Sequence, residues 1–306
     1  VKHYSYCTEK SYVGWVKRYI LFHNKQHPAT MTERHVQEFL THLAVVGKVT
    51  ASTQNQALNA IVFLYKHVLK KNLGDFSKAV RARRPRRNPV VLTKGEVHLI
   101  LTCLSDTQNK LIVRLLYGAG LRLAECVRVR VQDIDFIQGT IMIRAGKGDK
   151  DRTTVLPKNM VKELNLHLKR VKSQFERDLE DGFADVYLPN ALARKYPNAA
   201  KQWKWQYVFP ADHPSKDPRT NIIRRHHAYP GSVNREVQKA ARLAGIQKKM
   251  SSHAFRHSFV IEGGTDIRTV QELLGHKNIE TTQIYLHCLN RPGETVVSPL
   301  DQLEKQ

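Results

Sequence analysis

The segment that decides the fold class is residues 134–156, which read IDFIQGTIMIRAGKGDKDRTTVL. An apolar run at residues 141–143 is followed by a glycine-flanked turn at residues 146–148 and then by the β-branched run 153–155. Such runs, separated by a glycine turn, predict a β-hairpin or a small meander. Lys147 stands within the turn, so we expect a lysine at the tip of this hairpin.

Helical patterns flank the hairpin on both sides. Thr93 and Glu96 form a capping-box pattern, which predicts the start of a helix that continues to about residue 104. Residues 181–230 are loop-rich, with prolines and aromatic residues. Further helices are expected at about 109–117, from about 123, and at about 158–180, 232–244, 253–261, 266–274 and 279–287. The pattern predicts a mainly α fold with a small β-sheet, of the α+β class.

The charge of the chain favours a polyanionic partner. Its 306 residues hold 50 Lys and Arg against 27 Asp and Glu, a formal net charge of +23. The first 90 residues are the densest, with 16 Lys and Arg against 4 Asp and Glu. A generally cationic protein, such as a ribosomal one, is an alternative, whereas a membrane surface would call for a basic amphipathic segment or a lipid anchor, which we do not find. The uneven charge favours nucleic acid, gripped at the N-terminal end.

The first 80 residues predict a separate helical domain. Apolar periodicity predicts helices over 4–22, from Thr32 to about 46 and from about 52 to about 69. The outer faces of this bundle carry three lysines that are candidate contacts to nucleic acid: Lys66, Lys70 and Lys71.

Residues 81–90 predict a basic linker to a second domain at 91–306. Prolines stop helices and sheets, and neighbouring like charges repel each other. We interpret the segment as a linker that lies along a phosphate backbone, and the alternative is a solvated connector. The candidate phosphate contacts here are Arg83, Arg84, Arg86 and Arg87.

The cysteine and histidine patterns bear on compartment and cofactors. Four scattered cysteines without a CxxC pair fit a reducing compartment, and the apolar stretches are short. We expect a cytoplasmic, nucleoid-associated protein with no membrane contact. The adjacent His226 and His227 diverge and lack an acidic residue at ligand spacing, so we expect no metal and no cofactor.

Two arginines stand in settings that suit an anion. Residues 118–125 read GAGLRLAE, where glycines permit a sharp turn, Arg122 follows, and Glu125 can orient it. Arg256 lies in the segment HAFRH, where the i, i+3 spacing puts His253 on the same helix face. A guanidinium fork matches phosphate oxygens. Taken alone, however, an arginine after a glycine turn is more often an ordinary surface residue.

Two further residues complete a set suited to phosphoryl transfer. His276 ends the segment LLGH, and Tyr285 follows nine residues later on a short predicted helix. Moving a DNA strand without ATP requires a covalent protein–DNA intermediate, whose nucleophile must be an oxygen. A lysine such as Lys147 can protonate the departing oxygen. A tyrosine on a short amphipathic helix is, by itself, more often a core residue.

In order, spacing and combination these residues resemble the tyrosine recombinase (phage-type integrase) family. The resemblance covers nearly the whole chain and is carried by Arg122, Lys147, His253, Arg256, His276 and Tyr285. It implies a C-shaped DNA clamp built from a helical, SAM-like core-binding domain and a mixed catalytic domain. It also implies a role for each of these residues. Tyr285 would form a 3′-phosphotyrosine, Lys147 would protonate the 5′-hydroxyl, His253 would assist proton transfer, and the other three would bind the scissile phosphate.

The same resemblance implies how the protein assembles. Active tetramers of the family exchange strands through a Holliday junction, and the segment after the nucleophile packs on a neighbouring subunit. The tail at about 288–306 is apolar enough for that role, at Val296, Val297, Leu300 and Leu303.

The insert at about 181–230 gives a narrower resemblance, to integron integrases. It implies attI-like duplex sites and attC-like folded single-stranded hairpins as partners, and cassettes as the cargo. Aromatic side chains can stack on unpaired bases while Lys and Arg hold phosphates, although some of these aromatics could simply anchor the loop. The candidate DNA contacts in the insert are Trp203, Trp205, Arg224, Arg225, His226 and His227.

Two alternatives remain at this point. The protein could be a Xer- or phage-type recombinase that acts on double-stranded sites. It could also be a catalytically weakened DNA-binding member, because the stretch from Arg256 to His276 is about three residues shorter than the family pattern, close to one helical turn.

Overall fold

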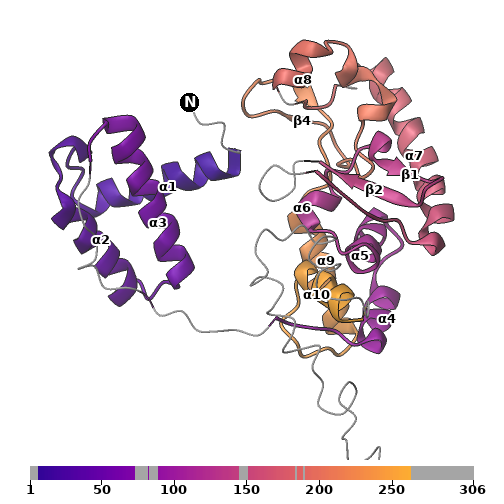
Figure 1. The fold of residues 1–306 in the computed structure, drawn as a ribbon, viewed down its shortest axis with the longest axis horizontal. Coiled ribbons are helices and arrows are strands. Elements are labelled where there is room, and N and C mark those ends of the chain that lie inside the picture. The colour runs from indigo at the N-terminus through magenta and orange to yellow at the C-terminus, as the bar shows by residue number, and fades with distance from the viewer. Residues whose placement is uncertain are drawn as a thin grey trace, which may run out of the picture. The chain divides into compact units, whose positions relative to one another are not determined.

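The structure, a computed structural model, describes residues 6–72, 82, 89–144, 151–182, 185–188 and 190–262. The chain forms two compact units, which divide between residues 87 and 88 (Figure 1). Within the described residues, no helix has the length and apolar character needed to cross a membrane.

Helices build the N-terminal unit, as its sequence pattern predicted. They are α1 (Tyr6–Phe22), α2 (Glu33–Val45) and α3 (Ala51–Phe63), and a 3-10 turn, η1 (Pro28–Thr30), precedes α2. The predicted third helix does not stay α-helical to its end, because a π-helical segment, η2 (Leu64–Leu69), continues α3.

Two buried tyrosines tie this unit together. The hydroxyls of Tyr19 and Tyr65 lie 3.1 Å apart, and the Tyr65 hydroxyl donates to the Pro28 carbonyl at 3.0 Å. A buried hydroxyl without a partner would cost about 1–3 kcal/mol, so this chain of hydrogen bonds satisfies both groups. It fastens η2 to the turn before α2, inside an apolar core that includes Trp15, Val36, Phe39, Leu40, Ala57 and Ile61.

Helix starts in both units follow the capping residues read from the sequence. The Thr93 hydroxyl accepts from the Glu96 amide at 3.2 Å, and the Glu96 carboxylate accepts from the Thr93 amide at 2.8 Å. The predicted capping box is therefore confirmed at the start of α4. Thr32 likewise precedes α2, with the ring of His35 accepting from its amide at 3.1 Å in place of a carboxylate.

Helices also make up most of the second unit. The central one is α5, which packs against α4, α9 and α10 and whose Ile112, Val113, Leu115 and Leu116 are fully buried. The helix expected from residue 123 is a single turn. Outside the insert, the helices that the structure describes in this unit are α4 (Lys94–Cys103), α5 (Gln108–Gly118), α6 (Leu123–Cys126), α7 (Val161–Glu180), α9 (Pro230–Leu243) and α10 (Ser252–Glu262) (Figure 1).

The predicted meander is an antiparallel sheet in the order β1-β2-β3. Its strands are β1 (Ile134–Asp135), β2 (Thr140–Ile143) and β3 (Arg152–Val155). Ile141 and Ile143 point into the core between residues that face outward. The register pairs Ile143 with Arg152, and Lys147, between these two residues in the sequence, lies outside the described residues.

The insert has more regular structure than the sequence predicted. It contains α8 (Asn190–Lys195), the 3-10 turns η5 (Ala199–Lys201) and η6 (Trp203–Trp205), and a two-stranded ladder of β4 (Ser215–Lys216) and β5 (Ile223–Arg224). A small separate core holds it together, made of Val186, Leu188, Ala199 and Tyr207.

The mainly α fold with a small sheet is therefore confirmed. Several predictions concern residues outside those that the structure describes. They are the helices at 266–274 and 279–287, most of the linker at 81–90, and the tail at 288–306.

Candidate active site

Arg122 sits where the chain turns from α5 into α6. Gly120 has a φ of +62°, a left-handed conformation that glycine adopts without steric cost, and this turn places Arg122 at the N-cap of α6. Its Nη1 donates to Glu125 Oε1 at 2.7 Å, and its amide donates to Glu125 Oε2 at 3.0 Å. Glu125 thus contacts both the side chain and the backbone amide of Arg122.

Arg256 reaches the same carboxylate from α10. Its side chain is only 3% exposed, and its Nη1 lies 3.7 Å from Glu125 Oε2. The same nitrogen donates to the Gly120 carbonyl at 2.5 Å. The packing of α10 on α5 therefore brings the two predicted arginines to one place.

A third arginine, Arg152, is a member of the cluster that sequence reasoning missed. It donates from Nη1 to Glu125 Oε1 at 3.0 Å and from Nη2 to Oε2 at 2.6 Å, a bidentate pair. Arg152 lies within the lysine-rich stretch 145–152, but nothing in that stretch indicates its partner 27 residues upstream. Its exposed fraction, 10%, equals that of Glu125.

Electrostatics keep Glu125 ionised. Burial would raise the pKa of Glu125, but hydrogen bonds and charge from Arg152 and Arg122 outweigh it and lower the pKa to about 2. One carboxylate charge then faces three guanidinium charges, so the cluster carries an excess of positive charge. Such a cluster suits a phosphate, whose oxygens accept from guanidinium groups.

His253 and His257 flank Arg256 on the same helix. Desolvation, followed by the charges of Arg256 and Arg122, lowers the pKa of His253. Burial, followed by the charges of His253 and Arg256, lowers the pKa of His257 to about 4. Both rings are therefore neutral at pH 7, and a neutral His253 can accept a proton or donate one from its ring N–H.

Three of the predicted catalytic residues, Lys147, His276 and Tyr285, lie outside the described residues. The linker arginines Arg83, Arg84, Arg86 and Arg87 lie outside them as well.

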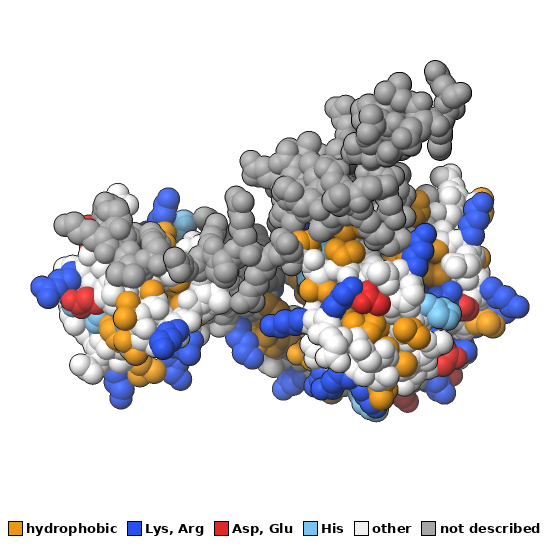
Figure 2. Space-filling view, turned by 90° about the horizontal axis from the view of Figure 1, so that it is seen from below, with side chains coloured by type: hydrophobic (Ala, Val, Ile, Leu, Met, Phe, Trp, Pro, Cys, Tyr) orange, Lys and Arg blue, Asp and Glu red, His pale blue; other side chains and the backbone are white. Residues whose placement is uncertain are grey.

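The predicted lysine contacts of the N-terminal unit are exposed. Lys66 lies on η2, and Lys70 and Lys71 follow it, although the ammonium of Lys71 donates to the Ala29 carbonyl. Lys and Arg side chains are spread over both units on the face that Figure 2 shows, with few acidic side chains between them. Each unit by itself therefore presents basic side chains that suit a phosphate backbone.

The two tryptophans of the insert are half-buried against the fold. Trp203 packs against Phe175 on α7, with ring centroids 5.6 Å apart. The guanidinium of Arg130 lies 5.8 Å from the centre of the Trp205 ring. These contacts position both tryptophans and leave part of each ring exposed.

The two adjacent histidines of the insert differ in their surroundings. His227 packs edge-on against Tyr207, with centroids 5.4 Å apart, and its Nδ1 bonds the Ala228 carbonyl. His226 is half-buried, and burial lowers its pKa although the nearby Asp217 opposes that effect. In the described part of the chain, no three His, Cys, Asp or Glu side chains group as metal ligands would.

The two adjacent arginines of the insert are engaged within the protein. Arg225 binds Asp178 through Nε at 2.5 Å and Nη2 at 2.7 Å, and its Nη1 donates to the carbonyls of Ala211 and Asp212. A guanidinium held in this way supports the fold, which speaks against the predicted role of Arg225 as a DNA contact. Arg224, which is 14% exposed, lies 3.8 Å from Asp217.

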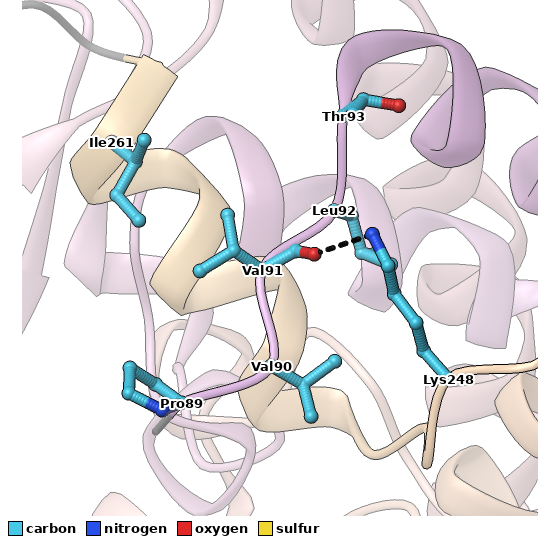
Figure 3. A pocket seen from close by; sticks show the side chains of 7 residues that line it. All are labelled: Pro89, Val90, Val91, Leu92, Thr93, Lys248 and Ile261. Carbon is cyan, nitrogen blue, oxygen red and sulfur yellow. Dashed lines mark hydrogen bonds between the residues drawn. The ribbon is translucent and has the colours of Figure 1, made fainter. Parts of the chain in front are cut away.

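The start of the second unit is fastened to α10. The Leu92 amide donates to the buried Ser258 hydroxyl at 2.8 Å, two residues from Arg256. Lys248 donates to the Val91 carbonyl at 2.9 Å beside a recess of about 470 Å³ (Figure 3). The recess is lined by Pro89, Val90, Val91, Leu92, Thr93, Lys248 and Ile261.

Comparisons with known proteins agree with the fold. A model of the phage integrase family matches residues 90–291, and a model of the phage integrase N-terminal SAM-like domain matches residues 1–75. An integrase/recombinase of Escherichia coli is 45% identical over 304 residues, which cover 98% of this chain and 90% of that protein.

A more distant relative and a solved structure extend the comparison. Tyrosine recombinase XerA of Thermococcus kodakarensis is 30% identical over 285 residues, 91% of this chain and 83% of that protein. A lambda integrase tetramer bound to a Holliday junction has a similar fold, with a TM-score of 0.62 at 14% identity over 97% of this chain and 76% of that one. The chain therefore belongs to the phage integrase family of tyrosine-type site-specific recombinases, enzymes that bind DNA and cleave and rejoin its strands.

Proposed function

We propose that Tyr285 is the nucleophile of this recombinase and that Arg122 and Arg256 hold the scissile phosphate. The observation that supports this most is the meeting of both guanidiniums at Glu125, at 2.7 Å and 3.7 Å. Neighbouring buried cations repel each other, and the surplus charge beyond Glu125 is best balanced by an anionic ligand. A phosphodiester supplies that charge and accepts the hydrogen bonds.

The proposed chemistry balances without ATP or a metal. The Tyr285 hydroxyl gives its proton to His253 as its oxygen bonds to phosphorus, the bond from phosphorus to the 5′-oxygen breaks, and Lys147 gives that oxygen a proton. The two arginines, with His276, stabilise the charge that develops on the nonbridging oxygens, and His253 assists proton transfer. Attack by a 5′-hydroxyl on the phosphotyrosine reverses the step and rejoins the strands.

A nicked suicide substrate tests these assignments, because it traps the covalent adduct. The wild-type chain should accumulate adduct and Tyr285→Phe should form none. Arg122→Ala and Arg256→Ala should each slow adduct formation by roughly 10²–10³-fold, the loss seen when one donor to a developing oxyanion is removed. Arg177→Ala, which removes an exposed arginine on α7, is the matched control. An adduct that persists in Tyr285→Phe would show that another residue is the nucleophile.

We propose further that the chain is an integron-type integrase that acts on attI-like duplexes and attC-like folded hairpins. The insert supports this, since it holds Trp203 and Trp205 half-buried and close to basic residues. A ring fixed by packing on one side and open on the other can stack on an extrahelical base. Stacking of this kind contributes about 1–3 kcal/mol per base.

Binding to a folded single-stranded hairpin and to its fully paired duplex distinguishes the two site classes. We expect tighter binding to the hairpin, and a loss of roughly 5–150-fold for the hairpin alone in Trp205→Ala, the equivalent of one stacked base. Tyr196→Ala, in the same insert and 46% exposed, is the control. Equal losses on hairpin and duplex would contradict the assignment.

A Xer- or phage-type recombinase on double-stranded sites is the second candidate. The identity of 30% to tyrosine recombinase XerA favours it. Under this alternative the chain binds the duplex at least as tightly as the hairpin, and the tryptophan variants change neither affinity.

We also propose that four copies assemble on DNA through the tail at 288–306. Apolar residues at 296, 297, 300 and 303 would then be buried against a neighbour. A chain that ends at residue 287 should still bind a single site but should no longer form tetramers on a Holliday junction, as measured by light scattering. Unchanged tetramers would contradict the role of the tail.

The short stretch after Arg256 leads to a separate hypothesis about rate. If it displaces His276 by about 1 Å, cleavage could fall on the order of a hundredfold, leaving a chain that binds DNA and recombines slowly. Insertion of Ala-Thr-His after Phe259 should then speed adduct formation on the suicide substrate. No gain in rate would count against the hypothesis.

A further inference from the structure

Arg152 stands at the base of the hairpin, directly against the carboxylate that orients the other arginines. It is the first residue of β3 and pairs with Ile143 of β2. Its two terminal nitrogens bind both oxygens of Glu125, at 3.0 Å and 2.6 Å, and both side chains are only 10% exposed. Arg152 thus makes two hydrogen bonds to Glu125, as many as Arg122 makes.

The hydrogen bonds around Glu125 occupy its acceptor sites. A carboxylate offers about four lone-pair sites, and Arg152 takes two while the amide and Nη1 of Arg122 take the others. Arg256 is left at 3.7 Å from the carboxylate and directs the same nitrogen to the Gly120 carbonyl. With Arg152 in place, Glu125 has no vacant site with which to capture Arg256.

The charge of the cluster leads to the same conclusion. With Arg152 present, three guanidinium charges face one carboxylate. Without it, the carboxylate would offset half the charge of the two remaining arginines and would offer them two vacant acceptor sites. A phosphate would then compete with Glu125 for the same donors, inside a site where burial strengthens every charge interaction.

We propose that Arg152 is a positioning residue of the recombination reaction. It saturates Glu125, so that Glu125 orients Arg122 without neutralising the arginines that receive the phosphate. This inference rests on the proposed function, in which Arg122 and Arg256 bind the scissile phosphate. Arg152 itself need not touch DNA.

The test combines a charge-removing variant with a neutral substrate. Arg152→Met keeps much of the side-chain stem and removes the guanidinium. On a nicked phosphodiester it should slow adduct formation by roughly 10–100-fold, the equivalent of one to two charged hydrogen bonds. On the same DNA with a methylphosphonate at the scissile position, which carries no negative charge, the loss should be several-fold smaller.

A second substitution tests whether Arg152 acts by saturating Glu125. Adding Glu125→Gln to Arg152→Met removes the competing carboxylate, so the double variant should cleave faster than Arg152→Met alone. Arg152→Lys, which keeps the charge but not the bidentate fork, should fall between wild type and Arg152→Met. Thermal melting and DNA affinity identify a variant that is merely unfolded. If Arg152→Met is unfolded, Arg152→Lys is compared with wild type instead.

The outcomes separate this inference from the proposed function. Wild-type cleavage by Arg152→Met overturns the inference, as does an equal loss on both substrates without relief by Glu125→Gln, which would indicate a purely structural role. Wild-type cleavage by Arg122→Ala and Arg256→Ala would instead overturn the phosphate site itself. If those two variants are slow while Arg152→Met is not, only the inference fails.

Discussion

Gly120→Ala should destabilise the second unit through two separable effects. Gly120 has a φ of +62°, which costs a residue with a Cβ about 1–2 kcal/mol. The added Cβ would lie 2.5 Å from Cδ1 and 2.6 Å from Cε1 of the Phe259 ring, closer than side chains pack. Overpacking of this kind costs about 1–3 kcal/mol, so we expect a total loss of about 2–5 kcal/mol.

Gly139 provides the matched control, because it has a φ of +66° and no atom within 4 Å of the added Cβ. Gly139→Ala should therefore show the backbone cost of about 1–2 kcal/mol alone. Replacing Phe259 with Leu in Gly120→Ala should recover part of the difference. Hydrogen exchange of the amides in α5 and α10, followed across urea concentrations, reports on this unit separately from the N-terminal one.

Gly120→Ala should also slow the cleavage reaction. The Gly120 carbonyl accepts from Arg256, and Phe259 lies on the helix that carries Arg256, so a shifted ring moves the guanidinium as well. Adduct formation on the nicked substrate should fall in Gly120→Ala and stay unchanged in Gly139→Ala. If Gly120→Ala is no less stable than Gly139→Ala, the close packing of α10 on this turn is refuted.

Three further changes test other parts of the structure. Thr93→Ala removes the cap of α4 and should cost about 1 kcal/mol, read from exchange in that helix; a change within error would mean that the capping box contributes nothing. Arg225→Met removes the ion-pair partner of the buried Asp178 carboxylate and should cost about 3–5 kcal/mol in thermal melts, while the DNA affinity of the folded fraction stays the same. Because its pKa is lowered to about 4, His257 contributes stability that is complete above its unfolded pKa of about 6.5 and is lost as the pH falls toward 4. His257→Gln should therefore be less sensitive than wild type between pH 7 and pH 5, and equal sensitivity would rule out this histidine as the source.

The local features of the fold were predictable because their signals are short. The capping pair Thr93 and Glu96 lies within one helical turn, and the strands at 140–143 and 152–155 follow β-branched and apolar runs next to a glycine turn. The insert was harder to predict. Its 3-10 turns and two-residue strands are too short to give a periodic signal.

In the candidate site, too, some residues could be predicted from the sequence and others could not. Arg122, Glu125 and Arg256 could be selected because each stands in a recognisable segment, and their meeting followed from the family resemblance. Arg152 could not be selected, since its bidentate partner is set by the sheet register and not by any nearby residue. Likewise the commitment of Arg225 to Asp178, 47 residues away, is a tertiary contact that composition cannot distinguish from a free basic residue.

The hydrogen bond between Leu92 and Ser258 has a mechanical consequence. Ser258 also donates to the Ala254 carbonyl, so the chain is anchored in the turn of α10 that contains Arg256. Tension along the polypeptide from the N-terminal side reaches this anchor through Pro89 to Val91, and Lys248 grips the Val91 carbonyl as a second anchor. Force applied to the linker is thus transmitted to the helix that carries Arg256. In a single-molecule stretching experiment, we expect the hydrogen bond of Leu92 to break early in the unfolding of this unit.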